Sequence, residues 1–557
     1  MLRDADTLPL LAIRDLEVRF GDNAEPVLHR VSLDVRRGER VAIVGQSGSG
    51  KSTIIGAIFG LLPGDGHISH GSIRLGANAL SPEGVVDEDL ATAGEMRMRR
   101  IRGARIGLVP QDPSSNLNPS MTVGAQIADA LAAHGVRGRG TIARRVVDLM
   151  TEAGIPEAGR RSGQFPHEFS GGMRQRVLIA IALAREPELL IADEPTSALD
   201  VTVQRQILDH LQTLVDARGT SLLFITHDLG VAADRTDRII VMLDGRIVEV
   251  GTPAQILREP QHEYTRRLVA AAPTVAATVR ARESAPVRDG DGGISDSAPI
   301  LVIENLVKEF TIRGQRGSVL RAVDDVSFSV ERRTTTAIVG ESGSGKTTVA
   351  RIILGLEAAT SGTALVDGHS ITASRGARRH DLRRRVQPVF QDPYASLDPT
   401  FSIERLIDEP LRIFRVGDTA SRRSRVGELL DQVALPRSIA QRRPNELSGG
   451  QRQRVAIARA LALDPELLIC DEAVSALDVL VQDQILELLM DLQSRLGLSY
   501  LFITHDLAVV RQIANNVVVM RKGSVVENGT VDDVFLAPTS EYTRELLGAI
   551  PGAAFAR

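Results

Sequence analysis

The sequence predicts an α/β fold that occurs twice in one chain. A glycine-rich loop at 45–53 returns at 340–348, and each copy follows a short apolar run rich in β-branched residues, 41–44 and 336–339. Such a run is typical of a buried parallel strand. A glycine-rich loop that ends in lysine and a hydroxyl residue is typical of the start of a helix. Strand, loop and helix in this order, present twice, indicate two α/β domains.

The two halves share their later landmarks, in the same order and at a constant spacing. The shared landmarks are Ser-Gly-Gly at 170–172 and 448–450, Asp-Glu at 193–194 and 471–472, His227 and His505, and Tyr264 and Tyr542. The stretch between the halves is rich in Asp, Gly, Ser and Arg and has almost no apolar periodicity, which is typical of an exposed linker. We therefore predict a first domain over 1–280, a linker over 281–299 and a second domain over 300–557.

Composition limits the classes of function. The chain of 557 residues is 43% hydrophobic and 24% charged, as globular proteins are, and its net charge of -4 gives no electrostatic reason to bind nucleic acid. No apolar run approaches the roughly 20 residues of a membrane helix, so a membrane role would act through a partner. The N-terminus lacks the apolar core of a secretory signal, which predicts a cytosolic chain. The single cysteine, Cys470, excludes an internal disulfide, and we expect it to be a buried small hydrophobe.

Both glycine-rich loops match the pattern G-x-x-x-x-G-K-[ST] of a phosphate-binding loop. Glycines let backbone N–H groups wrap around phosphates, and the N-terminus of the following helix adds favourable partial charge. We expect Lys51 and Lys346 to reach the β- and γ-phosphates, and the hydroxyls of Ser52 and Thr347 to hold Mg²⁺. The nucleotide-binding candidates of the two loops are Gly45, Ser47, Gly48, Gly50, Lys51, Ser52, Thr53, Gly340, Ser342, Gly343, Gly345, Lys346, Thr347 and Thr348.

Two further apolar runs each end in an adjacent pair of carboxylates, one pair in each half. Strands of α/β sheets present ligand-binding side chains at their carboxyl ends, and neighbouring side chains point to opposite faces. We therefore expect Asp193 and Asp471 to contact the shell of Mg²⁺. Glu194 and Glu472 are the expected catalytic residues that polarise the attacking water.

The segments 169–176 and 447–454 read Phe-Ser-Gly-Gly-Met-Arg-Gln-Arg and Leu-Ser-Gly-Gly-Gln-Arg-Gln-Arg. They resemble the signature motif of ATP-binding-cassette (ABC) proteins, which a generic phosphate-binding loop protein does not carry. Each half also has a glutamine before the signature and Ile-Thr-His-Asp after it, in the order of that family. The resemblance implies two P-loop NTPase domains, each with a RecA-like core, an antiparallel β subdomain and a helical subdomain that carries the signature.

The same resemblance implies that the two domains pack head-to-tail and share two ATP sites. One site would combine Lys51, Asp193, Glu194 and His227 with Ser448, Gly449 and Gly450. The other would combine Lys346, Asp471, Glu472 and His505 with Ser170, Gly171 and Gly172. A helix that starts at Ser-Gly-Gly presents backbone N–H groups that suit a γ-phosphate. The two histidines resemble the family's catalytic switch histidine, which senses the γ-phosphate.

Two more pairs of site residues follow from the resemblance. Gln111 and Gln391 match the family's glutamine, which contacts the nucleotide and Mg²⁺. Phe20 and Phe310 precede the phosphate loops and are candidates for stacking on adenine, with packing in the core as the open alternative.

The second half departs from the family pattern at two places. Residues 331–334, Glu-Arg-Arg-Thr, replace the usual Gly-Glu before the loop strand, and Ala473 and Val474 replace Pro-Thr after Glu472. Neither change removes a ligand of phosphate, metal or water. We therefore predict two hydrolytically competent sites with modest asymmetry.

The glutamine-loop sequences at 111–119 and 391–399 resemble those of bacterial peptide-importer ATPases. The tails at 262–268 and 541–547 resemble the terminal motif of the oligopeptide, dipeptide and nickel importer group. Within this group the first half resembles the D-type ATPase and the second half the F-type ATPase. In many relatives an iron–sulfur cluster follows the first tail, but residues 262–300 contain no cysteine, so we predict no cluster in this chain.

The resemblance implies an ATPase that powers peptide import from the cytoplasmic face of the cell membrane. Its expected cofactors are ATP and Mg²⁺. Its expected partners are two integral-membrane permease subunits, gripped near each glutamine loop, and an extracytoplasmic solute-binding protein, with no nucleic acid. Nickel complexes or other small solutes stay open as cargo.

Two alternatives come from other classes of protein. A soluble twin-cassette ATPase that acts on ribosomes or DNA would carry a long, charged, helical linker, whereas this linker is short and rich in Gly and Asp. An exporter ATPase is the other alternative, and the importer-like tails argue against it.

Overall fold

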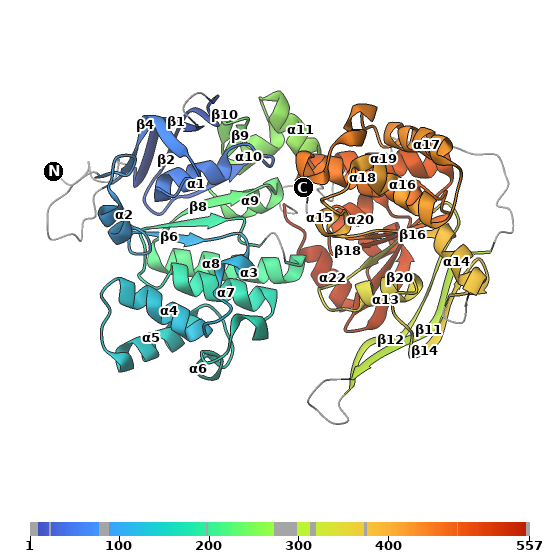
Figure 1. The fold of residues 1–557 in the computed structure, drawn as a ribbon. Coiled ribbons are helices and arrows are strands. Elements are labelled where there is room, and N and C mark those ends of the chain that lie inside the picture. The colour runs from blue at the N-terminus through green and yellow to red at the C-terminus, as the bar shows by residue number, and fades with distance from the viewer. Residues whose placement is uncertain are drawn as a thin grey trace. The chain divides into compact units, whose positions relative to one another are not determined.

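The computed structural model describes residues 9–21, 24–76, 88–196, 199–271, 298–311, 319–371, 376–475 and 477–552. The chain forms two compact units, the first made largely of residues before 273 and the second largely of residues after it (Figure 1). The predicted linker over 281–299 lies outside the described residues, except for its last two.

The first unit is built on a six-stranded sheet with the order β10-β9-β3-β8-β7-β6. Neighbouring strands pair in parallel, except that β10 runs antiparallel to β9. The strands are β3 (Arg40–Val44), β6 (Ile106–Val109), β7 (Leu189–Asp193), β8 (Ser221–Thr226), β9 (Arg238–Leu243) and β10 (Arg246–Gly251). Every residue of β8 is buried, as expected for a central strand with both faces covered. The helices that follow these strands along the chain are α1 (Lys51–Phe59), α8 (Val201–Arg218), α9 (Leu229–Arg235), α10 (Pro253–Arg258) and α11 (Glu263–Ala271).

A second, antiparallel sheet of the first unit has the order β2-β1-β4-β5. Its strands are β1 (Leu11–Phe20), β2 (Leu28–Val35), β4 (Gly66–Leu75) and β5 (Glu88–Asp89), and α2 (Glu95–Ile101) follows them. Ile13 and Ile73 of this sheet share one buried cluster with Ile54 and Ile58 of α1. The antiparallel sheet is therefore fixed to the helix that begins at the phosphate loop.

A group of helices between β6 and β7 forms the third part of the first unit. The helices are α3 (Pro113–Asn116), α4 (Val123–Ala133), α5 (Arg139–Glu152), α6 (Ala158–Arg161), a short 3-10 helix (Pro166–Glu168) and α7 (Gly171–Ala182). Ile127, Leu131, Leu149 and Val177 lie in a core that these helices form among themselves. The signature helix α7 thus belongs to a helical subdomain with its own packing.

The second unit repeats this plan. Its sheets have the orders β16-β17-β18-β13-β19-β20 and β12-β11-β14-β15. The strands are β11 (Leu301–Thr311), β12 (Val319–Val330), β13 (Thr335–Val339), β14 (Ser361–Val366), β15 (His369–Ser370), β16 (Val386–Val389), β17 (Leu467–Asp471), β18 (Ser499–Thr504), β19 (Asn516–Arg521) and β20 (Ser524–Thr530). The helices are α13 (Lys346–Ile353), α14 (Gly376–Arg385), α15 (Pro393–Ser396), α16 (Ile403–Ile413), α17 (Thr419–Gln432), two 3-10 helices (Arg437–Gln441 and Pro444–Glu446), α18 (Gly449–Leu461), α19 (Val479–Leu496), α20 (Leu507–Ile513), α21 (Val531–Leu536) and α22 (Glu541–Gly548). Both units therefore combine a mostly parallel sheet, an antiparallel sheet and a helical subdomain, which confirms the predicted fold class.

Residues 331–334, which depart from the family pattern, form a turn before β13 that matches the turn of the first unit. Arg333 adopts φ 61°, and the matching residue of the first unit, Gly38, adopts φ 69°. Both residues donate their backbone N–H to a serine hydroxyl at 2.9 Å, Arg333 to Ser499 and Gly38 to Ser221. The turn keeps its shape in the second unit, although a side chain in the left-handed region is strained.

The single cysteine, Cys470, is fully buried in β17, and burial raises the pKa of its thiol to about 12. It packs as a small hydrophobe, as the sequence predicts. Within the described residues, none of the helices combines the length and the apolar character that crossing a membrane requires.

Candidate functional site

The glycine-rich loop of each unit joins a central strand of the six-stranded sheet to the helix that begins at the lysine. Gly50 and Gly345 cap these helices with φ 97° and 102°, in the left-handed region that favours glycine. At the start of the loop, a Cβ on Gly45 would lie 2.3 Å from the carbonyl oxygen of Met242, and a Cβ on Gly340 would lie 2.1 Å from the equivalent oxygen in β19. Both ends of the loop therefore require glycine.

The loop lysines are buried and bound to the loop itself. Lys51 Nζ donates to the carbonyl oxygens of Gly45 at 2.6 Å and Gln46 at 2.8 Å. Lys346 Nζ makes the same two bonds in the second unit, at 2.7 and 2.8 Å. Burial lowers the pKa of Lys346 more than the nearby carboxylates raise it. Each ammonium group is thus held within its loop.

In the first unit, the predicted nucleotide and metal contact Gln111 and the catalytic candidate His227 both contact the carboxylate of the catalytic candidate Glu194. Gln111 Nε2 donates to Glu194 Oε2 at 2.9 Å, and His227 Nδ1 lies 3.1 Å from the same oxygen. Glu194 follows β7 and adopts φ 42°, with its N–H donating to the Ile225 carbonyl of β8 at 2.8 Å. The left-handed backbone aims the carboxylate at the ends of β6 and β8, where Gln111 and His227 lie.

The second unit assembles the same three groups. Gln391 Nε2 donates to Glu472 Oε2 at 2.6 Å, and His505 Nδ1 lies 3.4 Å from Glu472 Oε1. Glu472 has φ 48°. The structure therefore brings these sequence-predicted residues together in both halves.

The carboxylates of each Asp-Glu pair differ in their electrostatic setting. Burial and the charge of the adjacent Glu194 raise the pKa of Asp193 to about 6, and burial raises the pKa of Asp471 as well. Burial also acts to raise the pKa of Glu194, but the hydrogen bond and charge of His227 outweigh it, so the net shift is downward. The pKa of His227 is raised, because Glu194 outweighs the opposing effect of burial. The equivalent pair of the second unit shows the same shifts.

The two signature serines cap their helices. Ser170 Oγ accepts from the Met173 N–H at 3.4 Å, and Ser448 Oγ accepts from the Gln451 N–H at 3.3 Å. A Cβ on Gly172 would lie 2.7 Å from Val203, so the close approach of α8 requires glycine there. The first two residues of each signature helix are glycines, so no side chain covers the backbone N–H groups at these two positions.

The family model described as "ABC transporter" matches residues 28–197 and 323–475, which together make up more than half of the chain. The chain belongs to the ABC transporter family. The two matches cover both phosphate loops and both signatures, and they confirm that the chain carries two ATP-binding cassettes and is an ATPase. The model described as "Oligopeptide/dipeptide transporter, C-terminal region" matches residues 248–291, which include the first tail helix, α11.

Three curated relatives match nearly the whole chain. The glutathione import ATP-binding protein GsiA is 41% identical in Salmonella typhimurium and in Escherichia coli K12, and each match covers 99% of this chain and 91% of the relative. The oligopeptide transport ATP-binding protein OppD of Mycobacterium tuberculosis is 42% identical, with 98% of both chains covered. These matches confirm the resemblance to importer ATPases with two cassettes in one chain.

The two aromatic candidates for adenine stacking have different surroundings. Phe20 is partly buried against the core of the first cassette, and a Cβ on Gly66 would lie 2.6 Å from its ring. This position favours the core-packing alternative for Phe20. Phe310 is 37% exposed, with Lys308 Nζ 4.8 Å from the centre of its ring.

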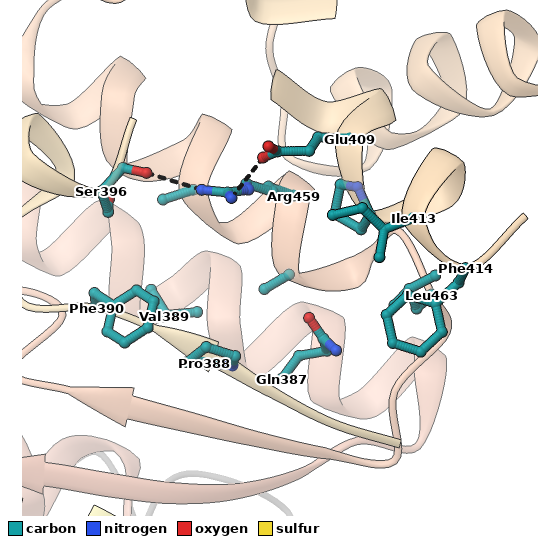
Figure 2. A pocket seen from close by; sticks show the side chains of 13 residues that line it. Gln387, Pro388, Val389, Phe390, Ser396, Glu409, Ile413, Phe414, Arg459 and Leu463 are labelled. Carbon is teal, nitrogen blue, oxygen red and sulfur yellow. Dashed lines mark hydrogen bonds and ion pairs between the residues drawn. The ribbon is translucent and has the colours of Figure 1, made fainter. Parts of the chain in front are cut away.

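A hollow of about 200 Å³ lies beside the glutamine loop of the second cassette (Figure 2). Its lining comes from β16, α15, α16, α18 and the residues next to them, and includes Phe390 and Ile413, which are 41% and 64% exposed. Arg459 donates to the Ser396 carbonyl at 2.8 Å and pairs with Glu409 at 2.7 Å, as Figure 2 shows. The hollow therefore presents apolar side chains beside a fixed ion pair.

Sequence reasoning missed one pair of residues at the phosphate loops. The tail tyrosines, Tyr264 and Tyr542, accept hydrogen bonds from the backbone N–H groups of Gln46 at 2.9 Å and Glu341 at 3.1 Å. The repeat of the tyrosine in both tails was the available signal. Spacing could not show that the tail folds back to the loop.

Replacement of Glu194 or Glu472 by Gln removes the charge that polarises water and nearly preserves side-chain size. We expect turnover at the altered site to fall at least about 100-fold, because general-base catalysis contributes roughly that much. With near-equivalent sites, each single variant loses half or more of the ATPase activity, and the two losses agree within about twofold. Steady-state phosphate release by the purified chain measures this.

The matched control is Glu428→Gln, which changes an exposed glutamate of α17, and we expect it to keep full activity. If one of the two site variants kept nearly all of the activity while the other lost it, the prediction of near-equivalent sites would be wrong.

Proposed function

We propose that this chain powers the import of peptides of the dipeptide and oligopeptide class, as the ATP-hydrolysing subunit at the cytoplasmic face of the cell membrane. Two integral-membrane permease subunits and an extracytoplasmic solute-binding protein would complete the machine. The observation that carries the proposal is the match of residues 248–291 to the oligopeptide/dipeptide transporter region, together with relatives that are named for glutathione and oligopeptide transport and match nearly the whole of this chain.

Two composite ATP sites are part of this proposal. Each phosphate loop would bind one ATP, and the signature helix of the other cassette would close over the γ-phosphate. The first site would use Lys51, Glu194 and His227 with Ser448, Gly449 and Gly450, and the second Lys346, Glu472 and His505 with Ser170, Gly171 and Gly172. We place the domains at 1–280 and 300–557, with the linker at 281–299.

The strand ends fit a magnesium ion. Thr347 Oγ1 donates to Asp471 Oδ1 at 3.4 Å, so a hydroxyl and a carboxylate from different elements converge. The aspartates are partly buried carboxylates with a raised pKa, and a divalent cation would offset the cost of their charge. Such oxygen donors suit Mg²⁺, which would neutralise charge on the phosphates. The proposed ligands are Ser52, Gln111 and Asp193 in one site and Thr347, Gln391 and Asp471 in the other.

The chain's own groups would carry out the remaining steps. Lys51 would exchange its bonds to the loop carbonyls for bonds to phosphate oxygens. Glu194, kept ionised by His227, would accept a proton from the attacking water while Gln111 and His227 fix its carboxylate. Differences in affinity between open and closed arrangements of the cassettes would then bias the permease between its two orientations.

Reconstitution tests the proposed function. The tagged chain is purified from native membranes with its copurifying integral-membrane subunits and binding protein, and the complex is placed in vesicles. We expect ATP-dependent uptake of at least one of three labelled probes, glutathione, a dipeptide or a longer peptide, with ATPase activity stimulated by that probe. Copurification with ribosomes in place of membrane proteins would contradict the proposal. If nickel alone stimulated the ATPase activity, the proposed cargo would have to be a nickel complex and not a peptide.

The hollow beside the glutamine loop is the proposed grip for a permease segment. Ile413→Glu places a charge on its apolar lining, and we expect recovery of the permease with the tagged chain to fall at least fivefold. Leu536→Glu is the matched control, because Leu536 is 68% exposed and lies in α21, outside this lining. Equal recovery of the permease with both variants would rule out the hollow as the grip.

A further inference from the structure

The tail helices α11 and α22 are amphipathic and bury one face against their own cassette. Tyr264 and Leu268 of α11 are 5% and 3% exposed, and Tyr542 and Leu546 of α22 are 3% and 4% exposed. A spacing of four residues places each pair on one helix face. The tyrosine side chains are therefore held inside the unit.

A strand carboxylate fixes the start of each tail helix. Glu249 of β10 accepts from the N–H groups of Gln261 and His262 at 2.8 and 3.0 Å. Glu527 of β20 accepts from the N–H groups of Thr539 and Ser540 at 2.7 and 3.2 Å. Each tail helix is thus anchored at its start by a carboxylate of its own cassette. This anchor gives the tyrosine hydroxyl of that helix a defined position.

Each tyrosine hydroxyl binds the residue that also holds the loop lysine. Gln46 donates its N–H to Tyr264 at 2.9 Å, while its carbonyl oxygen accepts from Lys51 Nζ at 2.8 Å. In the second cassette, Glu341 donates its N–H to Tyr542 at 3.1 Å, and its carbonyl accepts from Lys346 at 2.8 Å.

Burial raises the pKa of Tyr542 to about 12, so the group that accepts this bond is a protonated hydroxyl. Gln46 and Glu341, the second residues of the two loops, are each held from both sides. The tail tyrosine binds the backbone N–H, and the loop lysine binds the carbonyl oxygen.

We propose that Tyr264 and Tyr542 are positioning residues for ATP binding, which couple the importer-type tails to the phosphate loops. Each tyrosine hydroxyl fixes the peptide groups on either side of Gln46 or Glu341. The carbonyl oxygens of these peptide groups hold the lysine ammonium in position before phosphate binds. The inference rests on the proposed use of the loop lysines as phosphate ligands.

Removal of the two hydroxyls tests the inference. The double variant Tyr264→Phe/Tyr542→Phe keeps both rings but leaves the two loop N–H groups without their acceptor. An unsatisfied backbone group is costly, so we expect the KM for ATP to rise roughly five- to tenfold. The kcat is expected to stay within about twofold, because the water-polarising groups are untouched. The measurements are steady-state ATPase kinetics of the full chain and its thermal unfolding midpoint.

The matched control is Thr265→Val/Thr543→Val. It alters the next residue of each tail helix, which is fully buried and whose hydroxyl faces the anchoring carboxylate, Glu249 or Glu527. The control therefore changes the anchored tail itself but leaves the tyrosine bonds to the loops in place. We expect its KM to stay within about twofold of the parent chain. Equal KM increases in both double variants would show that the tyrosines act only through tail packing, and an unchanged KM in the tyrosine variant would also overturn the inference.

The single variant Tyr264→Phe provides a second test if the double variant does not fold. It is expected to split ATP saturation into a low-KM and a high-KM component, and a single unchanged component would contradict the inference. Loss of the proposed import function would be seen in vesicle uptake, whereas failure of this inference would be seen only in the KM difference between variant and parent. The two failures are therefore distinguishable.

Discussion

Parallel pairing of four adjacent strands is the constraint on which each set of catalytic groups depends. In the first cassette the order β3-β8-β7-β6 aligns four carboxyl ends, and the register pairs Val44 with Thr226. The glycine-rich loop begins directly after β3, Glu194 directly after β7 and His227 directly after β8, and Gln111 is the second residue after β6. A slip of one residue in any strand would turn its side chains to the other face. The buried strands therefore do more than stabilise the fold, because their register places the catalytic groups within hydrogen-bonding distance.

The ends of β3, β7 and β8 could be predicted from the sequence, because these apolar runs stop at a glycine, a pair of carboxylates and a histidine. The contacts between the ends could not. Nothing in the spacing of Glu194 and His227 shows that their side chains lie 3.1 Å apart, since that depends on which strands are neighbours. Family resemblance supplied those roles, and the structure supplies the left-handed backbone of Glu194 that directs its carboxylate.

The contact between each tail tyrosine and its phosphate loop could not be predicted from the sequence, because the two residues are far apart along the chain. The tail tyrosine is more than two hundred residues from the loop amide that it binds, at a separation of 218 residues for Tyr264 and 201 for Tyr542. Phe20 is a second example, because its ring is partly buried against the core beside Gly66 of the neighbouring strand β4. The distance of Phe20 from the phosphate loop along the sequence could not show this contact.

The two cassettes differ outside their catalytic groups more than within them. Ser448 shares a reciprocal capping box with Gln451, whereas Met173 at the matching position of the first signature helix provides only its backbone N–H. Arg452 lies over the ring of Tyr394 at 3.8 Å, while Arg174 donates to the Ser114 hydroxyl at 3.3 Å. These contacts join each signature helix to its glutamine loop by different chemistry. In both cassettes the glutamine and the histidine still contact the carboxylate, through one oxygen of Glu194 and through both oxygens of Glu472.

The number of ATP molecules bound per chain tests the central claim of two working sites most directly. Equilibrium dialysis of labelled ATP against a chain with Glu194→Gln and Glu472→Gln avoids hydrolysis during the measurement. Two functional phosphate loops predict two ATP per chain at saturation, falling to one when Lys51→Ala is added. Saturation at one ATP per chain before that change would contradict the presence of two nucleotide sites.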